Sequence, residues 1–417
     1  MRILFICDYF PPFSKGGGEI SSYCQAKKLT QQGVEVVVLA PKYKNRLKIR
    51  KENFKRYWYN FPFRLENSSP ILFLNPFFFF YLLWQIIKIC QKEKINLIHC
   101  QGKYSAPSSI FAKVFLKIPV ILTLRDYKGI CNHGFCLYKN KKSCNLFSFL
   151  KKDFWFYYKH YIKNKNIFSF LKQFIFSYFG RINTFILSFF MKRADKLVCV
   201  SDFIKKVYKV NRFPKEKLIT IYNLPPQKEI KEIELSRKLE DKMGQYKYVI
   251  LYVGKLSLGK GAGLLINTAQ DIIKKRKEVL FIFCGKIHYP IQKVKSKQLL
   301  FLGRIDQQLL FKIMKLVDIV CIPSIWPEPL SRVTLESFFL SKPVLSSRAG
   351  GQTELVNKKN GWLFNPHFDD FKEKINQALK EERSWKQKGM DGKKLIQNLE
   401  EKEIKKLINL YQSLILR

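Results

Sequence analysis

The amino-acid sequence predicts an α/β protein built from two Rossmann-like, doubly wound domains that face a cleft. Short apolar strands alternate with helical stretches along the 417 residues, the alternation occurs in two sets, and a polar, charged stretch separates them. This length is enough for two or three domains with separate cores. We predict an N-terminal domain over 1–222, a linker over 223–246, a C-terminal domain over 247–390, and a final helix over 391–417 that packs back towards the N-terminal domain.

The first set opens with a strand and a glycine-rich loop. Residues 3–7 are apolar but too few for the apolar region of a secretory signal peptide, so we expect no leader there. Gly16-Gly17-Gly18-Glu19 then begins a helix that Gly33 ends. The apolar run 34–39 is typical of a parallel strand buried on both faces. Further strands are expected at 97–99, 120–124 and 196–200.

The second set repeats this architecture without a sequence repeat. Its expected strands are 248–253, 279–284, 299–302, 319–322 and 343–346, and its expected helices are 263–275, 307–316 and 333–340. Two amphipathic helices, 371–388 and 391–416, are expected to end the chain.

The net charge of the chain limits the classes of partner that it is expected to bind. There are 76 Lys and Arg against 32 Asp and Glu, a formal net charge of +44, and 28 of the 37 Phe lie before residue 223. This balance disfavours an enzyme that acts on cations and favours a negatively charged partner, whether nucleic acid, anionic lipid or a phosphorylated small molecule. Biased composition accounts for part of the lysine excess.

One segment, residues 139–196, combines 13 basic residues with many aromatic ones. It is consistent with core helices carrying solvated lysines, or with an interfacial surface on anionic lipid headgroups. We leave these two alternatives open. A single-stranded nucleic-acid platform is disfavoured, because stacking needs isolated exposed rings and the apolar residues here are nearly continuous.

The apolar stretch 71–90 is interrupted by Asn75 and Pro76, which leaves only 77–84 uninterrupted, well short of the roughly 20 residues of a membrane span. We expect a buried helix there. The ten cysteines are too few for a disulfide framework. The sequence therefore predicts a cytoplasmic protein that is at most peripheral on the inner face of the cell membrane.

Three motifs carry candidate chemistry. The glycines at 16–18 could bring backbone amides to a phosphate at a helix start, or form an ordinary tight turn. In Gly254-Lys255-Leu256-Ser257-Leu258-Gly259-Lys260-Gly261, two cations beside free amides suit a diphosphate, although both could be solvated lysines. Glu328 and Glu336, eight residues apart around a loop and a helix start, could contact different parts of one elongated sugar ligand, or be ordinary glutamates.

The order of these motifs resembles the retaining glycosyltransferases of family 4, which have the two-domain GT-B fold. The resemblance covers almost the whole chain. It includes Pro11-Pro12 with the glycine loop, the strand end before Ser201, the lysine loop, the Glu-x7-Glu pattern of Glu328 and Glu336, and the later GGQTEL and NGW motifs. It implies metal-independent transfer of a sugar from a nucleotide-diphosphate-sugar to an acceptor hydroxyl. The excess of positive charge and of Phe before residue 223, in the expected acceptor domain, favours a glycan or lipid-linked acceptor and an anionic membrane surface over nucleic acid.

The resemblance also implies roles for individual residues. Lys260 and Glu328 would act in catalysis, with Asp126 orienting an acceptor hydroxyl. Donor binding would involve Gly17, Gly18, Lys255, Lys260, Glu328, Leu330, Ser331, Arg332 and Glu336. No metal ligand set is expected, and whether Cys131, Cys136 and Cys144 bind a metal stays open.

Two departures from the family pattern support an alternative. Arg125 stands where many members have His, and Ser331 stands where they have Gly. The alternative is a catalytically impaired protein of the same fold that binds nucleotide or an anionic membrane.

Overall fold

The computed structural model describes the chain except for residues 14–15, 43–51, 61–75, 135–148, 227–233 and 417. It divides into two compact units. The N-terminal unit contains Met1–Phe154, Asn166–Gln227 and Leu399–Arg417, and the C-terminal unit contains Trp155–Lys165 and Lys228–Asn398. Each unit is an α/β structure with its own parallel sheet, which confirms the predicted fold class.

The N-terminal unit is built on a seven-stranded parallel sheet in the order β3-β2-β1-β4-β5-β6-β7. Its strands are β1 (Arg2–Ile6), β2 (Glu35–Pro41), β3 (Lys55–Tyr59), β4 (Leu97–Cys100), β5 (Val120–Leu124), β6 (Lys196–Cys199) and β7 (Leu218–Thr220). The strand order reverses between β1 and β4, and side chains beyond the carboxyl ends of these two strands are therefore placed around one crevice.

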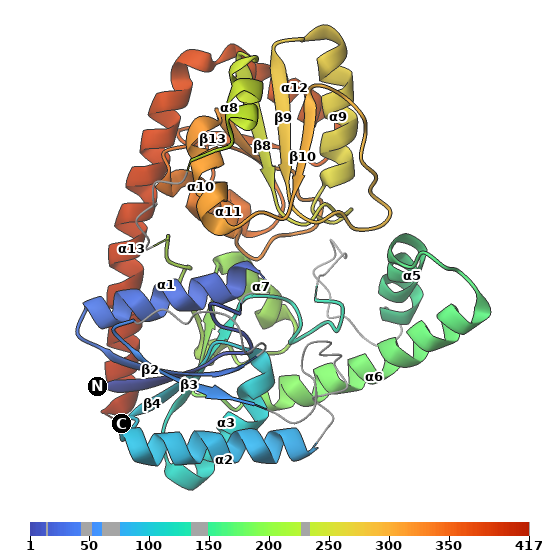
Figure 1. Cartoon of the computed structure of the whole chain (residues 1–417). Helices are drawn as coiled ribbons and strands as arrows, with labels where there is room; N and C mark the ends of the chain where they lie inside the picture. Colours follow the sequence, from blue (N-terminus) through green and yellow to red (C-terminus); the bar gives the residue numbers. More distant parts are fainter. Residues whose placement is uncertain (14–15, 43–51, 61–75, 135–148, 227–233, 417) are drawn as a thin grey trace. The chain divides into compact units, whose positions relative to one another are not determined.

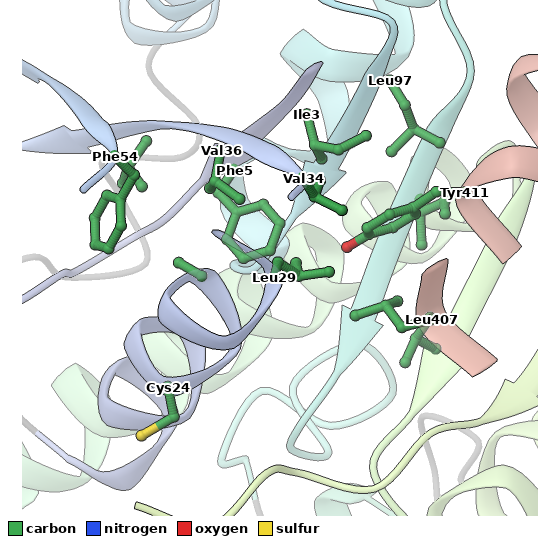
Figure 2. Packing of buried hydrophobic residues seen from close by; sticks show 14 of the residues in the cluster. Ile3, Phe5, Cys24, Leu29, Val34, Val36, Phe54, Leu97, Leu407 and Tyr411 are labelled. Carbon is green, nitrogen blue, oxygen red and sulfur yellow. The ribbon is translucent and has the colours of Figure 1, made fainter. Parts of the chain in front are cut away.

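Helices cover both faces of this sheet. They are α1 (Gly17–Gln31), α2 (Pro76–Glu93), α3 (Ala106–Leu116), α6 (Ile167–Met191) and α7 (Asp202–Val210). Figure 1 shows α1 on one face of the sheet and α2 with α3 on the other. On the α1 face, Leu29 packs against Phe5 and Val36, together with Leu407 and Tyr411 from the end of the chain (Figure 2).

The C-terminal segment contributes to this core through the last turns of α13 (Trp385–Ile415). Tyr411 is fully buried, and its hydroxyl lies 2.6 Å from Nδ1 of His99 on β4. The other ring nitrogen, Nε2, lies 2.7 Å from the Thr123 hydroxyl. Burial holds the pKa of His99 well below its usual value, so this histidine is neutral and joins the helix to the sheet.

The C-terminal unit has a six-stranded parallel sheet in the order β10-β9-β8-β11-β12-β13. Its strands are β8 (Tyr248–Val253), β9 (Val279–Cys284), β10 (Leu299–Gly303), β11 (Ile319–Ile322), β12 (Val344–Ser347) and β13 (Gly361–Phe364). Its helices are α5 (Trp155–Tyr161), α8 (Arg237–Gly244), α9 (Ala262–Lys275), α10 (Gln307–Leu316), α11 (Arg332–Phe339) and α12 (Phe368–Lys380). One core packs α9 and α12 on the sheet, and a second packs α8 and α10.

Several predicted elements differ from the structure. The predicted linker contains α8, whose Met243 is buried in the second of these cores. The stretch expected as a buried helix becomes α2, but Phe77 is 73% exposed, and residues 71–75 lie outside the described part of the chain. Strands β3 and β7 were not predicted, because the first is rich in charged and aromatic residues and the second has three residues.

The last two helices are separated at a different place from the one predicted. The prediction placed the break near Gly389, but α12 ends at Lys380 and α13 already begins at Trp385. Gly389 lies inside α13, where a Cβ would come 1.9 Å from the carbonyl oxygen of Ser341. This glycine allows close packing and does not end a helix.

Candidate active site

The candidate donor residues of the C-terminal unit lie on loops after strands β8 and β11, on either side of the point where the strand order reverses. The glycine loop 254–261 follows β8, and the loop 323–331 follows β11. A third loop, 348–350, follows the neighbouring strand β12. Ligands of doubly wound sheets bind at this edge, because successive loops there diverge and leave a crevice between them.

Glu328 is the centre of a hydrogen-bond network. Its Oε1 accepts bonds from Nζ of Lys260 at 2.5 Å, from the Ser324 hydroxyl at 2.6 Å and from Nε1 of Trp326 at 2.8 Å. Burial opposes ionisation of this carboxyl group, but the charge of Lys260 and the three bonds outweigh it, so the pKa of Glu328 lies below its usual value. The three bonds converge on Oε1 of the carboxylate.

Lys260 is held in place on two sides. Its ammonium group forms the ion pair with Glu328 and lies 5.3 Å from the ring centroid of Trp326. Its side chain stays 31% exposed, in contrast to 6% for Glu328. A cation that is fixed by a buried carboxylate and still open on one side is suited to binding a phosphate oxygen.

The glycines around this network allow loops to approach closely. Gly261 has φ +70, and a Cβ there would lie 1.7 Å from the carbonyl oxygen of Pro323. Gly350 has φ +76, and a Cβ there would lie 2.2 Å from the carbonyl oxygen of Glu328. The amide of Gly351 donates to that same carbonyl at 2.7 Å. The GGQTEL motif therefore supports the backbone of the Glu328 loop.

The sequence predicted free amides in the glycine loop, and the structure corrects this in part. Four of the eight amides of residues 254–261 already donate within the protein, at Gly254, Leu256, Gly259 and Gly261. The acceptor for Gly259 is the hydroxyl of Tyr161 on α5, at 3.2 Å. Half of the amides of this loop are therefore unable to bind an anion without losing an internal bond. Tyr161 was not singled out from the sequence, because no local pattern links it to residues a hundred positions away.

The other predicted donor residues of this unit lie on the same loops or on α11. Lys255 is exposed on the glycine loop, while Leu330 and Ser331 are buried just before α11. Ser331 has φ −74, an ordinary value for any residue, so this backbone position does not require glycine. The buried carboxylate of Glu336 accepts a bond from Nε of Arg332 at 3.2 Å and one from Gln307 at 3.5 Å. Burial raises the pKa of Glu336, and Arg332 opposes this shift.

Replacing Gly261 with alanine should destabilise the protein for two reasons. The positive φ strains the backbone of an alanine, and the added Cβ clashes with the carbonyl oxygen of Pro323. Gly303 provides the matched control, because it has the same φ of +70 but a Cβ there would meet no atom within 4 Å. We expect Gly303→Ala to cost about 1 kcal/mol of unfolding free energy. Gly261→Ala should cost about 1–3 kcal/mol more. Chemical denaturation measures both, and equal costs would contradict the close approach to Pro323.

In the N-terminal unit, a polar pocket lies beyond the carboxyl ends of β1, β4 and β5. Asp8 and Tyr9 come from the loop after β1, Gly18 and Glu19 from the start of α1, and further groups from the loops after β4 and β5. These further lining residues are Gln101, Gly102, Lys103, Tyr104, Arg125, Asp126 and Lys128. Arg125 donates to the carbonyl oxygen of Gln101 at 3.0 Å. Gly17 and Gly18 form the exposed first turn of α1.

Asp126 uses both carboxylate oxygens within the protein. Oδ2 pairs with Nζ of Lys103 at 2.6 Å, and Oδ1 accepts the amide of Lys128 at 2.9 Å. Burial opposes ionisation of Asp126, but the charges of Lys103 and Lys128 outweigh it, and the pKa lies below its usual value. The predicted acceptor residue is thus an ionised carboxylate that holds Lys103.

Asp8 is one of the residues of this pocket that the sequence analysis missed. Burial raises its pKa to about 6; Lys103 and Lys128 lower it, and Asp126 and Glu19 raise it. The carboxylate lies against Gly102, where a Cβ would come 2.2 Å from Cγ of Asp8. The signal available in the sequence was its position two residues after the first strand, at the edge where doubly wound sheets bind ligands.

The structure describes only one of the three cysteines that could bind a metal. Cys131 is buried, whereas Cys136 and Cys144 lie outside the described residues. Among the residues that the structure describes, no group of three or more His, Cys, Asp or Glu side chains could hold a metal ion.

Two parallel doubly wound units, each with polar side chains at its switch point, define the two-domain GT-B class of glycosyltransferase. A family model described as Glycosyltransferase Family 4 matches residues 15–224, and one described as Glycosyl transferases group 1 matches residues 228–395. The chain belongs to glycosyltransferase family 4, as its sequence motifs predicted.

The chain is also similar to curated relatives and, in fold, to solved structures. Spore coat protein SA of Bacillus subtilis is 25% identical over 211 residues, a match that covers 44% of this chain and 55% of that protein. The GPI3 subunit of phosphatidylinositol N-acetylglucosaminyltransferase from Saccharomyces cerevisiae is 22% identical over 398 residues, covering 91% and 75%. The structure of Anabaena Alr3699/HepE in complex with UDP has a TM-score of 0.65, with 16% identity and coverage of 98% and 100%.

Proposed function

We propose that the protein transfers a sugar from a nucleotide-diphosphate-sugar to an acceptor hydroxyl, with retention of the anomeric configuration. The observation that carries the proposal is the Lys260–Glu328 pair at the switch point of the C-terminal sheet. Lys260 would neutralise charge that grows on the diphosphate as it leaves, and Lys255 on the same loop would contribute to diphosphate binding. The UDP bound to Alr3699/HepE is consistent with such a donor.

Glu328 and Glu336 would bind the rest of the donor. Oε2 of Glu328 would accept a hydroxyl of the sugar, and Glu336 would hold the ribose, as the family resemblance implies. Three hydrogen bonds hold Oε1 of Glu328 in place, so its carboxylate is fixed relative to Lys260. We assign Glu328 to positioning the donor.

The pocket of the N-terminal unit would receive the acceptor. Its carboxylates, Asp8 and Asp126, suit a neutral hydroxyl better than a phosphate, and Glu19 already accepts the Gly16 amide at 2.8 Å at the start of α1. We therefore favour acceptor binding over phosphate binding for Gly17 and Gly18. A glycan or lipid-linked precursor is the proposed acceptor class; the yeast relative's name joins a sugar transfer to phosphatidylinositol.

A screen of UDP-, GDP- and ADP-sugars against the full chain tests the proposal. We expect one donor to be turned over, in a product whose anomeric coupling constant by NMR matches that of the donor. Turnover should persist in EDTA, since lysines take the place of a metal at the diphosphate. Nucleotide binding without hydrolysis or transfer of any donor would instead favour the impaired protein that Arg125 and Ser331 suggested.

Asp8 provides a pH-dependent prediction. Above a pH of about 6 its carboxylate is ionised and can accept the proton of an acceptor hydroxyl; below this pH it is neutral. We expect kcat/KM of the wild type to fall as the pH drops through 6. Asp8→Asn should lower kcat/KM at pH 7.5 by a factor of about 10–100 and abolish this acidic limb.

The control for Asp8 is Glu216→Gln, which removes an exposed carboxylate of the same unit. It should leave both the rate and the pH profile unchanged. An acidic limb that persists unchanged in Asp8→Asn would assign the titration to another group and contradict the role of Asp8.

A further inference from the structure

The outer surface of α6 is apolar along its whole length. Phe168 and Phe185, near its two ends, are 78% and 73% exposed. Exposed apolar side chains recur between them every three or four residues, so they lie on one side of the helix. This stripe consists of Phe168, Leu171, Ile175, Tyr178, Ile182, Phe185 and Phe189.

The side of α6 that faces the protein is less uniformly apolar. Its buried residues are Ser177, Gly180, Asn183, Thr184, Leu187 and Met191. The carbonyl of Ser177 accepts a bond from Asn132 at 3.2 Å, and Arg181 donates to the carbonyl of Ile130 at 2.5 Å. A helix at the surface of a water-soluble domain normally buries its apolar side and exposes its polar side. In α6 large apolar residues line the exposed side, so its outer surface is suited to an apolar environment.

Two neighbouring helices extend this surface. Phe77, Phe80 and Trp84 are exposed on α2, and Phe111, Val114 and Phe115 are exposed on α3. The Ser108 hydroxyl of α3 bonds to the carbonyl of Phe79 on α2 at 3.0 Å, and the Phe111 ring lies 5.6 Å from that of Phe190 on α6. All three helices belong to the N-terminal unit (Figure 1). We call the exposed apolar residues of α2, α3 and α6 the apolar face.

The charges on these helices indicate the partner. Lys88, Lys92 and Lys172 are basic residues of these helices, whereas Arg181 bonds to Ile130 and Lys113 pairs with Asp195 within the protein. The single acidic residue of the three described helices, Glu93, is buried. Some cations lie directly beside exposed rings, as does Lys88 at 5.0 Å from the centroid of Trp84. Two copies meeting through this face would bring like charges together. Anionic headgroups above an acyl layer would match both the cations and the apolar residues.

We propose that the apolar face docks the N-terminal unit onto the surface of an anionic lipid bilayer, with α6 lying in the interface. By length and composition α6 could also cross a membrane. About 33% of its most apolar 18-residue stretch is buried in the protein. Its hydrogen bonds to Ile130 and Asn132 favour the interfacial position, because crossing would require those contacts to break. The proposed location is therefore peripheral, on the cytoplasmic side. This inference does not depend on the proposed sugar transfer.

Flotation of the full chain with vesicles tests the docking. Vesicles of phosphatidylcholine with 30 mol% phosphatidylglycerol should carry the wild type, and pure phosphatidylcholine should carry about tenfold less, since both charge and apolar burial contribute. Raising the salt should weaken binding without abolishing it. Wild type that does not float with anionic vesicles, or floats equally with neutral ones, would overturn the proposal.

A triple variant, F168S/I175S/F185S, removes three side chains of the stripe and should reduce flotation about tenfold or more. The control L316S/F368S/M390S removes three exposed apolar residues of the C-terminal unit and should float like the wild type. Both variants should keep the thermal midpoint and nucleotide binding of the wild type, which separates lost docking from lost folding or lost donor recognition. A wild-type dimer that the first variant converts to monomer, with unchanged flotation, would assign the face to a second copy instead.

Discussion

Lys260→Met is expected to lower kcat/KM by a factor of about 10²–10³, the loss seen when one preorganised group that stabilises transition-state charge is removed. The reason is the fixed position of the Lys260 ammonium group. The buried carboxylate of Glu328 holds it at 2.5 Å and Trp326 packs beside it, so its charge is directed at the diphosphate without reorganisation. Initial rates with the donor found in the screen measure the loss.

The control for this variant is Lys275→Met, which removes one exposed positive charge from the end of α9. It should keep full activity, because it lies away from the glycine loop. Lys260→Arg should restore part of the rate, since it keeps the charge but replaces a compact ammonium with a planar group. Full turnover by Lys260→Met with an unchanged thermal midpoint would remove Lys260 from the mechanism.

Patterns within a short stretch of chain were sufficient to predict most of the fold. Strands such as β5, β8 and β11 are continuous apolar runs because parallel strands are buried on both faces, and their limits could be read directly. The glycine loop and the Glu-x7-Glu pattern were recognisable for a related reason, since their chemistry depends on residues close together in sequence. The direct pairing of Lys260 with Glu328, 68 positions apart, could not be read in this way.

The sequence predicted poorly which side of a helix is buried against the rest of the protein. The apolar residues of α2 suggested burial, yet Phe77 and Trp84 are exposed, because composition does not indicate which face is covered. The interpretation of 139–196 stayed open for the same reason. Residues 139–148 lie outside the described part, and in α6 the structure exposes a row of large apolar side chains. The break between the last two helices was placed wrongly, because a glycine that ends a helix and one that permits close packing look alike in a sequence.

Glu328→Gln should lower kcat/KM by a factor of about 10². The neutral amide can still accept the bonds of Ser324 and Trp326, but it loses the ion pair with Lys260 and offers a different group to the sugar. Binding of the free nucleotide diphosphate should weaken less than binding of the nucleotide-sugar. The affinities of the two ligands, measured by calorimetry on each variant, report these losses separately.

The double variant, Lys260→Met with Glu328→Gln, distinguishes the two roles of Glu328. If Glu328 acted only by holding Lys260, the double variant would be no slower than Lys260→Met alone, because the group that it holds would already be absent. If Oε2 also binds a sugar hydroxyl, a further loss of about tenfold should remain, equal to about 1.4 kcal/mol. We expect this second result, since all three internal bonds of Glu328 end on Oε1. Equal rates for the double variant and Lys260→Met would reduce Glu328 to a positioning residue for the lysine.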